Sequence, residues 1–114
     1  MEDCLFCKIV SKKIPAELIF EDDRIVAFND INPQAPIHIL IIPKEHFASL
    51  NDVPEEQKDL LGHILIRGRQ IAQNMGIHEN GYRIVLNTAR DSGQVVFHIH
   101  FHLLGGRHMT WPPG

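Results

Sequence analysis

Three histidines, His98, His100 and His102, alternate with apolar residues in the segment 95–104. Successive side chains of a β-strand point to opposite faces, so this spacing puts all three imidazoles on one face. The positions on the opposite face are all apolar: Val95, Phe97, Ile99, Phe101 and Leu103. The pattern therefore predicts a strand that packs one face into a hydrophobic core and presents histidines on the other.

A single histidine on such a strand is usually structural, but three on one face require an explanation. Burying a polar group without a hydrogen-bond partner costs about 1–3 kcal/mol. Clustered imidazoles suit a polar ligand, a metal ion or a phosphate group. The histidine face is therefore the first candidate for a functional site, and the residues alone leave these three ligands open.

Length and composition predict one globular domain spanning residues 1–114, with a tail at about 107–114. A chain of 114 residues with 44% apolar residues suits a single core. The formal net charge of −3 offers no basic surface for a nucleic acid. No apolar stretch has the length of a membrane span or the pattern of a signal peptide. We therefore expect a cytoplasmic protein that binds neither nucleic acids nor membranes.

The hydrophobic pattern also predicts the remaining elements. Short strands are expected at 17–20, 24–29, 37–42 and 82–87, the first two joined by a hairpin turn. Apolar residues at helical spacing predict a long amphipathic helix through residues 60–75, begun by a capping box of Asp52 and Glu55 and ended by Gly76. Because only one strong helix is available for crossover connections, the strands should pair mostly antiparallel in an α+β fold.

The only cysteines, Cys4 and Cys7, form a Cys-x-x-Cys pair. In a reducing compartment such a pair favours metal binding or redox activity over a structural disulfide. A thioredoxin-like redox site would follow a strand, and no strand is predicted before Cys4. The pair therefore favours half of a zinc site, which needs two further ligands.

The run His98-Ile99-His100-Phe101-His102-Leu103-Leu104 matches the signature of the histidine triad superfamily, in which histidines and apolar residues alternate. The chain resembles the nucleotide-binding branch of that superfamily along nearly its whole length. The resemblance is carried by the segments 14–15, 20–23, 30–36, 38–44, 104–107 and 111–114. It implies a mostly antiparallel five-stranded sheet with one long helix and a shorter one, and a sheet that extends across a homodimer.

The resemblance further implies a purine nucleoside phosphoramidase. Such enzymes cleave the P–N bond of adenosine 5′-phosphoramidates and hydrolyse aminoacyl-adenylates through a nucleotidyl-histidine intermediate. In this chain His100 would attack the α-phosphorus, His102 would donate a hydrogen bond to a phosphate oxygen, and His38 would belong to the same proton network. Because neighbouring imidazoles disfavour one another's protonation, we expect His100 to remain neutral and nucleophilic at pH 7.

Further positions are assigned to the purine nucleotide by resemblance. Asp30 would hold the ribose hydroxyls with Ile31 beside the nucleoside, Asn87 would contact the ribose-phosphate region, and the backbone of Gly93, Gln94 and Val95 would cradle the phosphate. Many relatives carry serine where this chain has Val95. A valine offers only its backbone N–H, so we expect the chemistry to survive with an altered leaving-group preference or rate.

The resemblance also completes the cysteine pair. Some histidine triad proteins bind zinc at positions that correspond here to Cys4, Cys7, His46 and His98. Two thiolates and two imidazoles form a closed structural site with no open position for catalysis, and no organic cofactor is implied. The remaining histidines, His63, His78 and His108, match no motif position and are expected on the surface.

Three other functions remain as alternatives. One is a dinucleoside polyphosphate hydrolase of the same superfamily, although Trp111-Pro112-Pro113-Gly114 and Gly105-Gly106-Arg107 favour the phosphoramidase branch. Another is a metalloenzyme with the three triad histidines as zinc ligands, but no carboxylates that would orient such ligands are evident beside them. The third is a regulatory nucleotide-binding protein.

Overall fold

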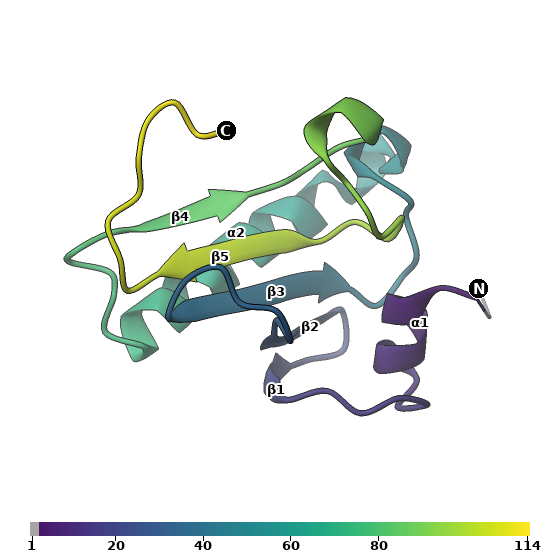
Figure 1. Ribbon diagram of the computed structural model, residues 1–114. Coiled ribbons are helices and arrows are strands. Elements are labelled where there is room, and N and C mark those ends of the chain that lie inside the picture. Colours follow the sequence, from purple (N-terminus) through teal and green to yellow (C-terminus); the bar gives the residue numbers. More distant parts are fainter. Residues whose placement is uncertain (1–2) are drawn as a thin grey trace.

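Five strands form one antiparallel sheet in the computed structural model, which describes residues 3–114 (Figure 1). The strands are β1 (Leu18–Glu21), β2 (Ile25–Asn29), β3 (Ile37–Pro43), β4 (Tyr82–Val85) and β5 (Phe101–Gly105), and the sheet order is β1-β2-β3-β5-β4. The helices are α1 (Leu5–Val10) and α2 (Lys58–Asn74). Single 3-10 turns lie at Leu50–Asp52, Glu55–Gln57 and Arg90–Ser92. This arrangement confirms the predicted α+β fold.

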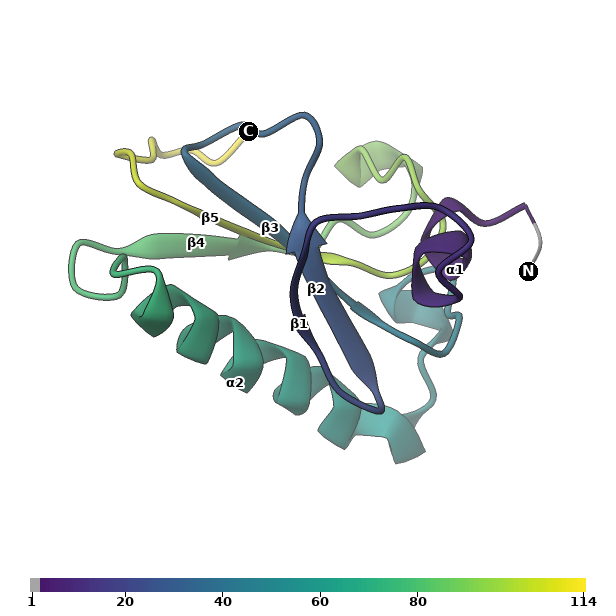
Figure 2. The ribbon, with the colours of Figure 1, turned by 90° about the horizontal axis from the view of Figure 1, so that it is seen from below.

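Helix α2 covers one face of the sheet and α1 lies on the other side (Figure 2). The core beneath α2 is built from apolar side chains of the helix and of the central strands. Its fully buried members include Ile25, Ile39, Ile41, Ile64 and Leu103. Gly68 lets α2 lie close to the sheet, because a Cβ atom there would be 3.3 Å from Cδ1 of Ile84. Within the described residues, no helix is both long and apolar enough to span a membrane.

The opposite face has a smaller apolar cluster. Phe6 and Ile9 of α1 pack against Val26, Phe28, Leu40 and Ile42 of β2 and β3. His38 alternates with Ile37 and Ile39, so it lies on this same face. Because His102 pairs with Leu40 across the sheet, it lies there as well. The sheet therefore separates a purely apolar core from a face that carries both α1 and histidines.

The predicted histidine strand is shorter than expected, since β5 begins only at Phe101 and contains His102 alone of the three histidines. The ladder with β3 stops at the pair Ile41 and Phe101. Beyond it, Pro43 has no N–H to donate, and its carbonyl accepts a hydrogen bond from the ring of His98 at 2.8 Å. The His98 side chain thus replaces the next backbone hydrogen bond between β3 and β5.

The apolar positions before β5 also differ from the prediction. Ile99, Phe101 and Leu103 enter the core, but Val95 is 83% exposed and Phe97 is 56% exposed. The segment leaves the sheet because the N–H of Ile99 donates to the carbonyl of Phe47, at 2.7 Å, outside the strands. The prediction of a continuous buried face was therefore wrong at its first two positions.

The start of the long helix was also predicted wrongly. Asp52 closes a capping box with Ser49 on the first 3-10 turn, and its Oδ2 accepts from the Ser49 N–H at 3.1 Å. Pro54 and a second 3-10 turn follow before α2 begins at Lys58. The predicted end is confirmed, because Gly76 adopts φ +75° just after the helix. Strand β4 ends at Val85, two residues before the predicted limit.

His63, which was expected on the surface, is partly exposed and lies against a carboxylate. Its Nε2 lies 2.7 Å from Oδ2 of Asp22, and its side chain is 33% exposed. The other oxygen of Asp22 accepts the backbone N–H groups of Arg24 and Ile25 at 2.8 Å. This carboxylate therefore stabilises the hairpin turn between β1 and β2 and, through His63, connects the turn to α2.

Candidate functional site

The structure gathers the three triad histidines and His38 on the face that carries α1. His98, His100 and His38 are buried, and His102 is half-buried. Ring centroids are 5.0 Å apart between His100 and His102, and 5.2 Å apart between His38 and His102. The rings are therefore close enough to share hydrogen bonds and to influence one another's protonation.

The hydrogen bond of His100 determines which of its nitrogens is free. Nδ1 lies 2.8 Å from the backbone carbonyl of His98. A carbonyl only accepts, so Nδ1 carries the proton of the neutral ring and Nε2 keeps its lone pair. Burial lowers the pKa of His100, so the ring is neutral at pH 7. Neutrality was predicted from repulsion between imidazoles, whereas burial is its main cause.

His38 and His102 form a second directed pair. The Gln34 N–H donates to Nδ1 of His38 at 3.0 Å, so the proton of neutral His38 is on Nε2. That proton points to Nδ1 of His102 at 2.9 Å, with Oδ2 of Asp30 3.4 Å away. The proton of neutral His102 is consequently on its own Nε2, which becomes a hydrogen-bond donor.

Both of these rings are neutral at pH 7. Burial, followed by repulsion from His100 and His38, lowers the pKa of His102 to about 4. Burial also lowers the pKa of His38, and the nearby carboxylate of Asp30 opposes this in part. The site thus combines the free Nε2 lone pair of His100 with an N–H donor at Nε2 of His102.

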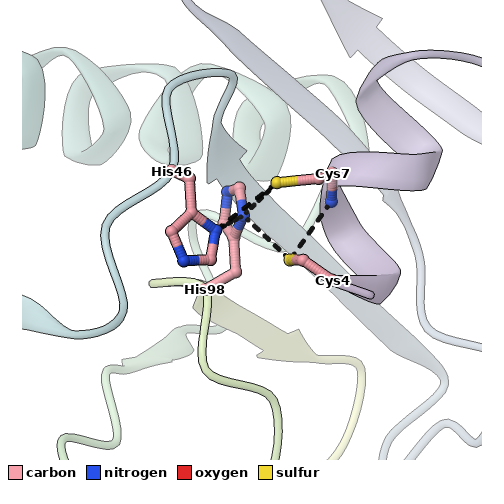
Figure 3. A group of neighbouring side chains, drawn as sticks. All are labelled: Cys4, Cys7, His46 and His98. Carbon is pink, nitrogen blue, oxygen red and sulfur yellow. Dashed lines mark hydrogen bonds between the residues drawn. The ribbon is translucent and has the colours of Figure 1, made fainter. Parts of the chain in front are cut away.

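One triad histidine, His98, also belongs to a group of four ligand atoms: Cys4, Cys7, His46 and His98, here called the tetrad (Figure 3). Nδ1 of His98 is 3.5 Å from Sγ of Cys4, 3.6 Å from Sγ of Cys7 and 3.2 Å from Nδ1 of His46. Zinc bonds of about 2.0–2.3 Å at tetrahedral angles separate ligand atoms by about 3.3–3.8 Å. The spacing therefore fits a tetrahedral cation.

Local structure explains how the tetrad forms. Cys4 caps the N-terminus of α1, where its Sγ accepts the N–H of Cys7 at 3.3 Å, so one helical turn brings the two sulfurs together. His98 donates its Nε2 proton to the Pro43 carbonyl and so turns the lone pair of Nδ1 toward the sulfurs. Burial and the neighbouring Cys4 raise the pKa of the Cys7 thiol, so at neutral pH a bound cation is needed to hold the thiolate.

A second cluster, Asp30, His38 and His102, brings its ligand atoms within 4.8 Å of one another. It suits a cation poorly, because the nitrogen of His38 that faces the cluster carries a proton. The three residues are better described as a hydrogen-bonded group beside His100.

The residues expected to bind the nucleotide are distributed around this face. The side chain of Asp30 is 19% exposed and reaches His38, whereas Ile31 is fully exposed. Asn87 lies just beyond β4 and is half-buried. Gly93 and Val95 are exposed, but Gln94 is buried with its carboxamide bonded to protein backbone.

Two parts of the site had no counterpart in the sequence prediction. The Phe6 ring lies edge-on to His98 and His100, with centroids 6.0 Å and 5.1 Å away. The sequence offers only a weak signal for Phe6, its place next to the cysteine pair, because residues one and two positions apart on a helix do not share a face. The backbone partners of the imidazoles, by contrast, depend on the tertiary fold and leave no local signal.

The chain matches the model of the HIT domain over residues 11–109, and it therefore belongs to the HIT domain family. It is 48% identical over 106 residues to the purine nucleoside phosphoramidase of Escherichia coli K12, covering 93% of this chain and 89% of the relative. The crystal structure of a HIT family hydrolase from Legionella pneumophila is 58% identical and superposes with a TM-score of 0.96, covering 98% of this chain and all of that one. These similarities support a hydrolase of this family.

A further solved structure bears on the tetrad. A zinc-bound histidine triad family protein from Mycobacterium smegmatis is 34% identical, with a TM-score of 0.81 over 93% of this chain and 76% of that one. Zinc is thus found in a protein of the same fold, and in this chain the tetrad is a group that could hold a metal ion.

Proposed function

We propose that this protein is a purine nucleoside phosphoramidase that also hydrolyses aminoacyl-adenylates, with His100 as the nucleophile. The observation that carries the proposal is the hydrogen bond from Nδ1 of His100 to the His98 carbonyl, which leaves the Nε2 lone pair free. A covalent nucleophile needs such a free lone pair in a rigid position. The similarity to a phosphoramidase of Escherichia coli supports the same reaction.

In the first step, Nε2 of His100 attacks the α-phosphorus and forms a P–N bond to the ring. The bond from phosphorus to the leaving amine breaks, and the amine takes a proton from solvent, which the water consumed in the second step returns. The ring becomes positively charged, and its Nδ1 proton is already bonded to the His98 carbonyl. The Nε2 proton of His102 stabilises the charge that develops on a phosphate oxygen.

In the second step, water attacks the phosphorus and breaks its bond to His100. Nucleoside monophosphate leaves, and His100 returns to its neutral form with Nδ1 protonated. The net reaction consumes the phosphoramidate and one water and yields the monophosphate and an amine. The hydrogen bonds among His38, His102 and Asp30 provide a route for protons during both steps.

The nucleotide would lie between the histidines and the loops around them. Asp30 would accept the ribose hydroxyls, with Ile31 and Asn87 beside the nucleoside and the ribose-phosphate. The loop at residues 93–95 would bind the phosphate through the backbone N–H of Val95, because the N–H groups of Gly93 and Gln94 already donate to backbone carbonyls. Because Val95 has no hydroxyl, its side chain gives no hydrogen bond to the phosphate or the leaving group.

Zinc is the metal that best suits two thiolates and two imidazoles. Bound to Cys4, Cys7, His46 and His98, it would supply structural rigidity. The carbonyl of His98 orients His100, so a rigid His98 keeps the nucleophile in place. In this proposal the protein also acts in the cytoplasm as a homodimer.

The test is hydrolysis of a fluorogenic adenosine 5′-phosphoramidate by the wild type, by His100→Ala and by His78→Ala, whose side chain is 43% exposed and serves as control. We expect turnover to fall by about 10⁴-fold or more in His100→Ala and to be unchanged in the control. Mass spectrometry after rapid quenching should detect nucleotidylated wild type only. Turnover that survives without His100, or faster cleavage of dinucleoside polyphosphates, would refute the proposal.

A further inference from the structure

Two adjacent residues in the loop between β4 and β5 show the opposite of the usual burial, with a polar side chain buried and an apolar one exposed. Gln94 is only 5% exposed, whereas the adjacent Val95 is 83% exposed. Amide side chains are mostly exposed and large aliphatic ones mostly buried, so the reversal calls for a specific cause. For Gln94 the cause is a set of hydrogen bonds that needs the whole carboxamide.

The carboxamide of Gln94 bonds only to backbone groups. Oε1 accepts the N–H of Ala89 at 2.8 Å, and Nε2 donates to the carbonyls of Ala48 at 2.7 Å and Val96 at 3.0 Å. The oxygen and both amide protons are therefore engaged. If the carboxamide were rotated by 180°, its oxygen would lie against two carbonyl oxygens. Glutamate has the same shape without the two donors, and methionine has a similar size without any of these bonds.

The first of these bonds stabilises the proposed phosphate-binding loop. Ala89 adopts φ +68°, a conformation that is unfavourable for residues with a Cβ atom. Gln94 holds it from two sides, since its side chain accepts the Ala89 N–H and its backbone N–H reaches the Ala89 carbonyl at 3.3 Å. These two hydrogen bonds close the loop between Ala89 and Gln94, and they determine the path of the backbone at Gly93 and Val95.

The other two bonds connect this loop to the tetrad. Ala48 follows the ligand His46 by two residues, and Val96 precedes the ligand His98 by two. By donating to both carbonyls, Gln94 links the two segments whose imidazole Nδ1 atoms lie 3.2 Å apart. One buried side chain therefore joins the loop at 89–95 to two of the four candidate metal ligands.

We propose that Gln94 is a positioning residue whose side chain fixes the position of the phosphate-binding loop relative to the metal tetrad. All of its carboxamide hydrogen bonds go to backbone groups, and through them it makes phosphate binding and metal binding depend on one another. The phosphate-binding half of this inference rests on the proposed function, whereas the metal-binding half rests on the tetrad alone. Losing the carboxamide should therefore weaken both binding events together.

The experiment compares Gln94→Met with Gln73→Met, a matched control at an exposed position of α2. Co²⁺ affinity is measured from the absorption of tetrahedral cobalt thiolate, and AMP affinity is measured by calorimetry on the metal-loaded protein. Loss of a group that orients metal ligands typically weakens metal binding 10–100-fold. We expect about a 10-fold or greater loss of both affinities in Gln94→Met and no change in the control.

Gln94→Glu serves as a second variant should Gln94→Met fail to fold. It keeps an acceptor for Ala89 but sets oxygen against the carbonyls of Ala48 and Val96, so Co²⁺ affinity should fall about 10-fold or more and the cobalt spectrum should change. A lower melting temperature with both affinities unchanged would make Gln94 merely structural and overturn the inference. So would wild-type protein that does not bind Co²⁺. Wild type that binds Co²⁺ but neither binds AMP nor cleaves phosphoramidates would instead refute the proposed function.

Discussion

His98 and His100 present opposite ring nitrogens because each donates its other proton to a backbone carbonyl. His98 gives its Nε2 proton to Pro43, so Nδ1 faces the sulfurs of the tetrad. His100 gives its Nδ1 proton to the carbonyl of His98, so Nε2 is free. Two histidines of one motif thus suit different tasks, one as a metal ligand and the other as a nucleophile.

Protonation of His102 links this site to the acid stability of the protein. Its pKa falls from 6.5 to about 4 on folding, so below pH 6.5 the unfolded chain binds a proton that the folded chain does not. The contribution of His102 to stability is present above pH 6.5 and is lost as the pH falls toward 4. One such proton changes the free energy of unfolding by about 1.4 kcal/mol per pH unit.

Between pH 6.5 and about 4, we therefore expect the free energy of unfolding to fall less in His102→Asn than in the wild type. The slope against pH should be smaller by up to about 1.4 kcal/mol per pH unit, the effect of one proton. Urea unfolding at several pH values measures this slope. His108→Asn, at an exposed position, should follow the wild type. Identical slopes for His102→Asn and the wild type would show that this imidazole does not change its pKa on folding.

At the scale of elements, short helix α1 places chemistry on the sheet. Its first turn carries Cys4 and Cys7, and its buried face carries Phe6 and Ile9 onto strands β2 and β3. A helix of six residues has little stability of its own. Its position therefore depends on this packing and on any metal ion bound by the tetrad.

Metal binding should consequently stabilise the protein through α1. Zinc at about 100 times its dissociation constant would add about 2.7 kcal/mol to the free energy of unfolding. We expect chelator to lower the melting temperature of the wild type, and zinc to have little effect on Cys7→Ser. Calorimetric melting with and without zinc measures both, and Lys8→Ser on the same helix is the control. An equal response of Cys7→Ser and the wild type to zinc would exclude the tetrad as the site.

How far the sequence predicted these elements depends on how local their causes are. The strands at 18–29 and 37–43 and the end of α2 at Gly76 follow from hydrophobic spacing and glycine geometry, and the prediction was close. The late start of β5 follows from the pairing of His98 with Pro43, residues 55 apart in the chain. The burial of Gln94 depends on Ala48, 46 residues away. Such contacts exist only in the folded chain.

Across the whole molecule, the sheet divides structural work from chemistry. Helix α2 and α1 lie on opposite sides of the sheet (Figure 2). The larger core lies beneath α2, and the tetrad and the histidines lie on the side of α1. Changes on the chemical face can therefore proceed without disturbing the larger core. The arrangement also leaves β1 and β4 as the edges of the sheet.

An edge strand with free backbone groups can pair with another chain, and β4 is the edge nearer the site at β5. Pairing of two copies there would continue the sheet and place both α2 helices on one face. The exposed apolar side chains Leu65 and Ile66 of α2, each 45% exposed, would then have a partner to pack against. This supports the proposed homodimer.

We expect sedimentation to give twice the chain mass of 13.0 kDa at micromolar concentration. Ile66→Glu should shift the protein toward the monomer, because it puts a charge into the apolar contact while costing an exposed position little stability. Arg69→Glu, also exposed on α2, should remain dimeric. A monomeric wild type would refute the homodimer, and a dimer insensitive to Ile66→Glu would place the contact away from this face of α2.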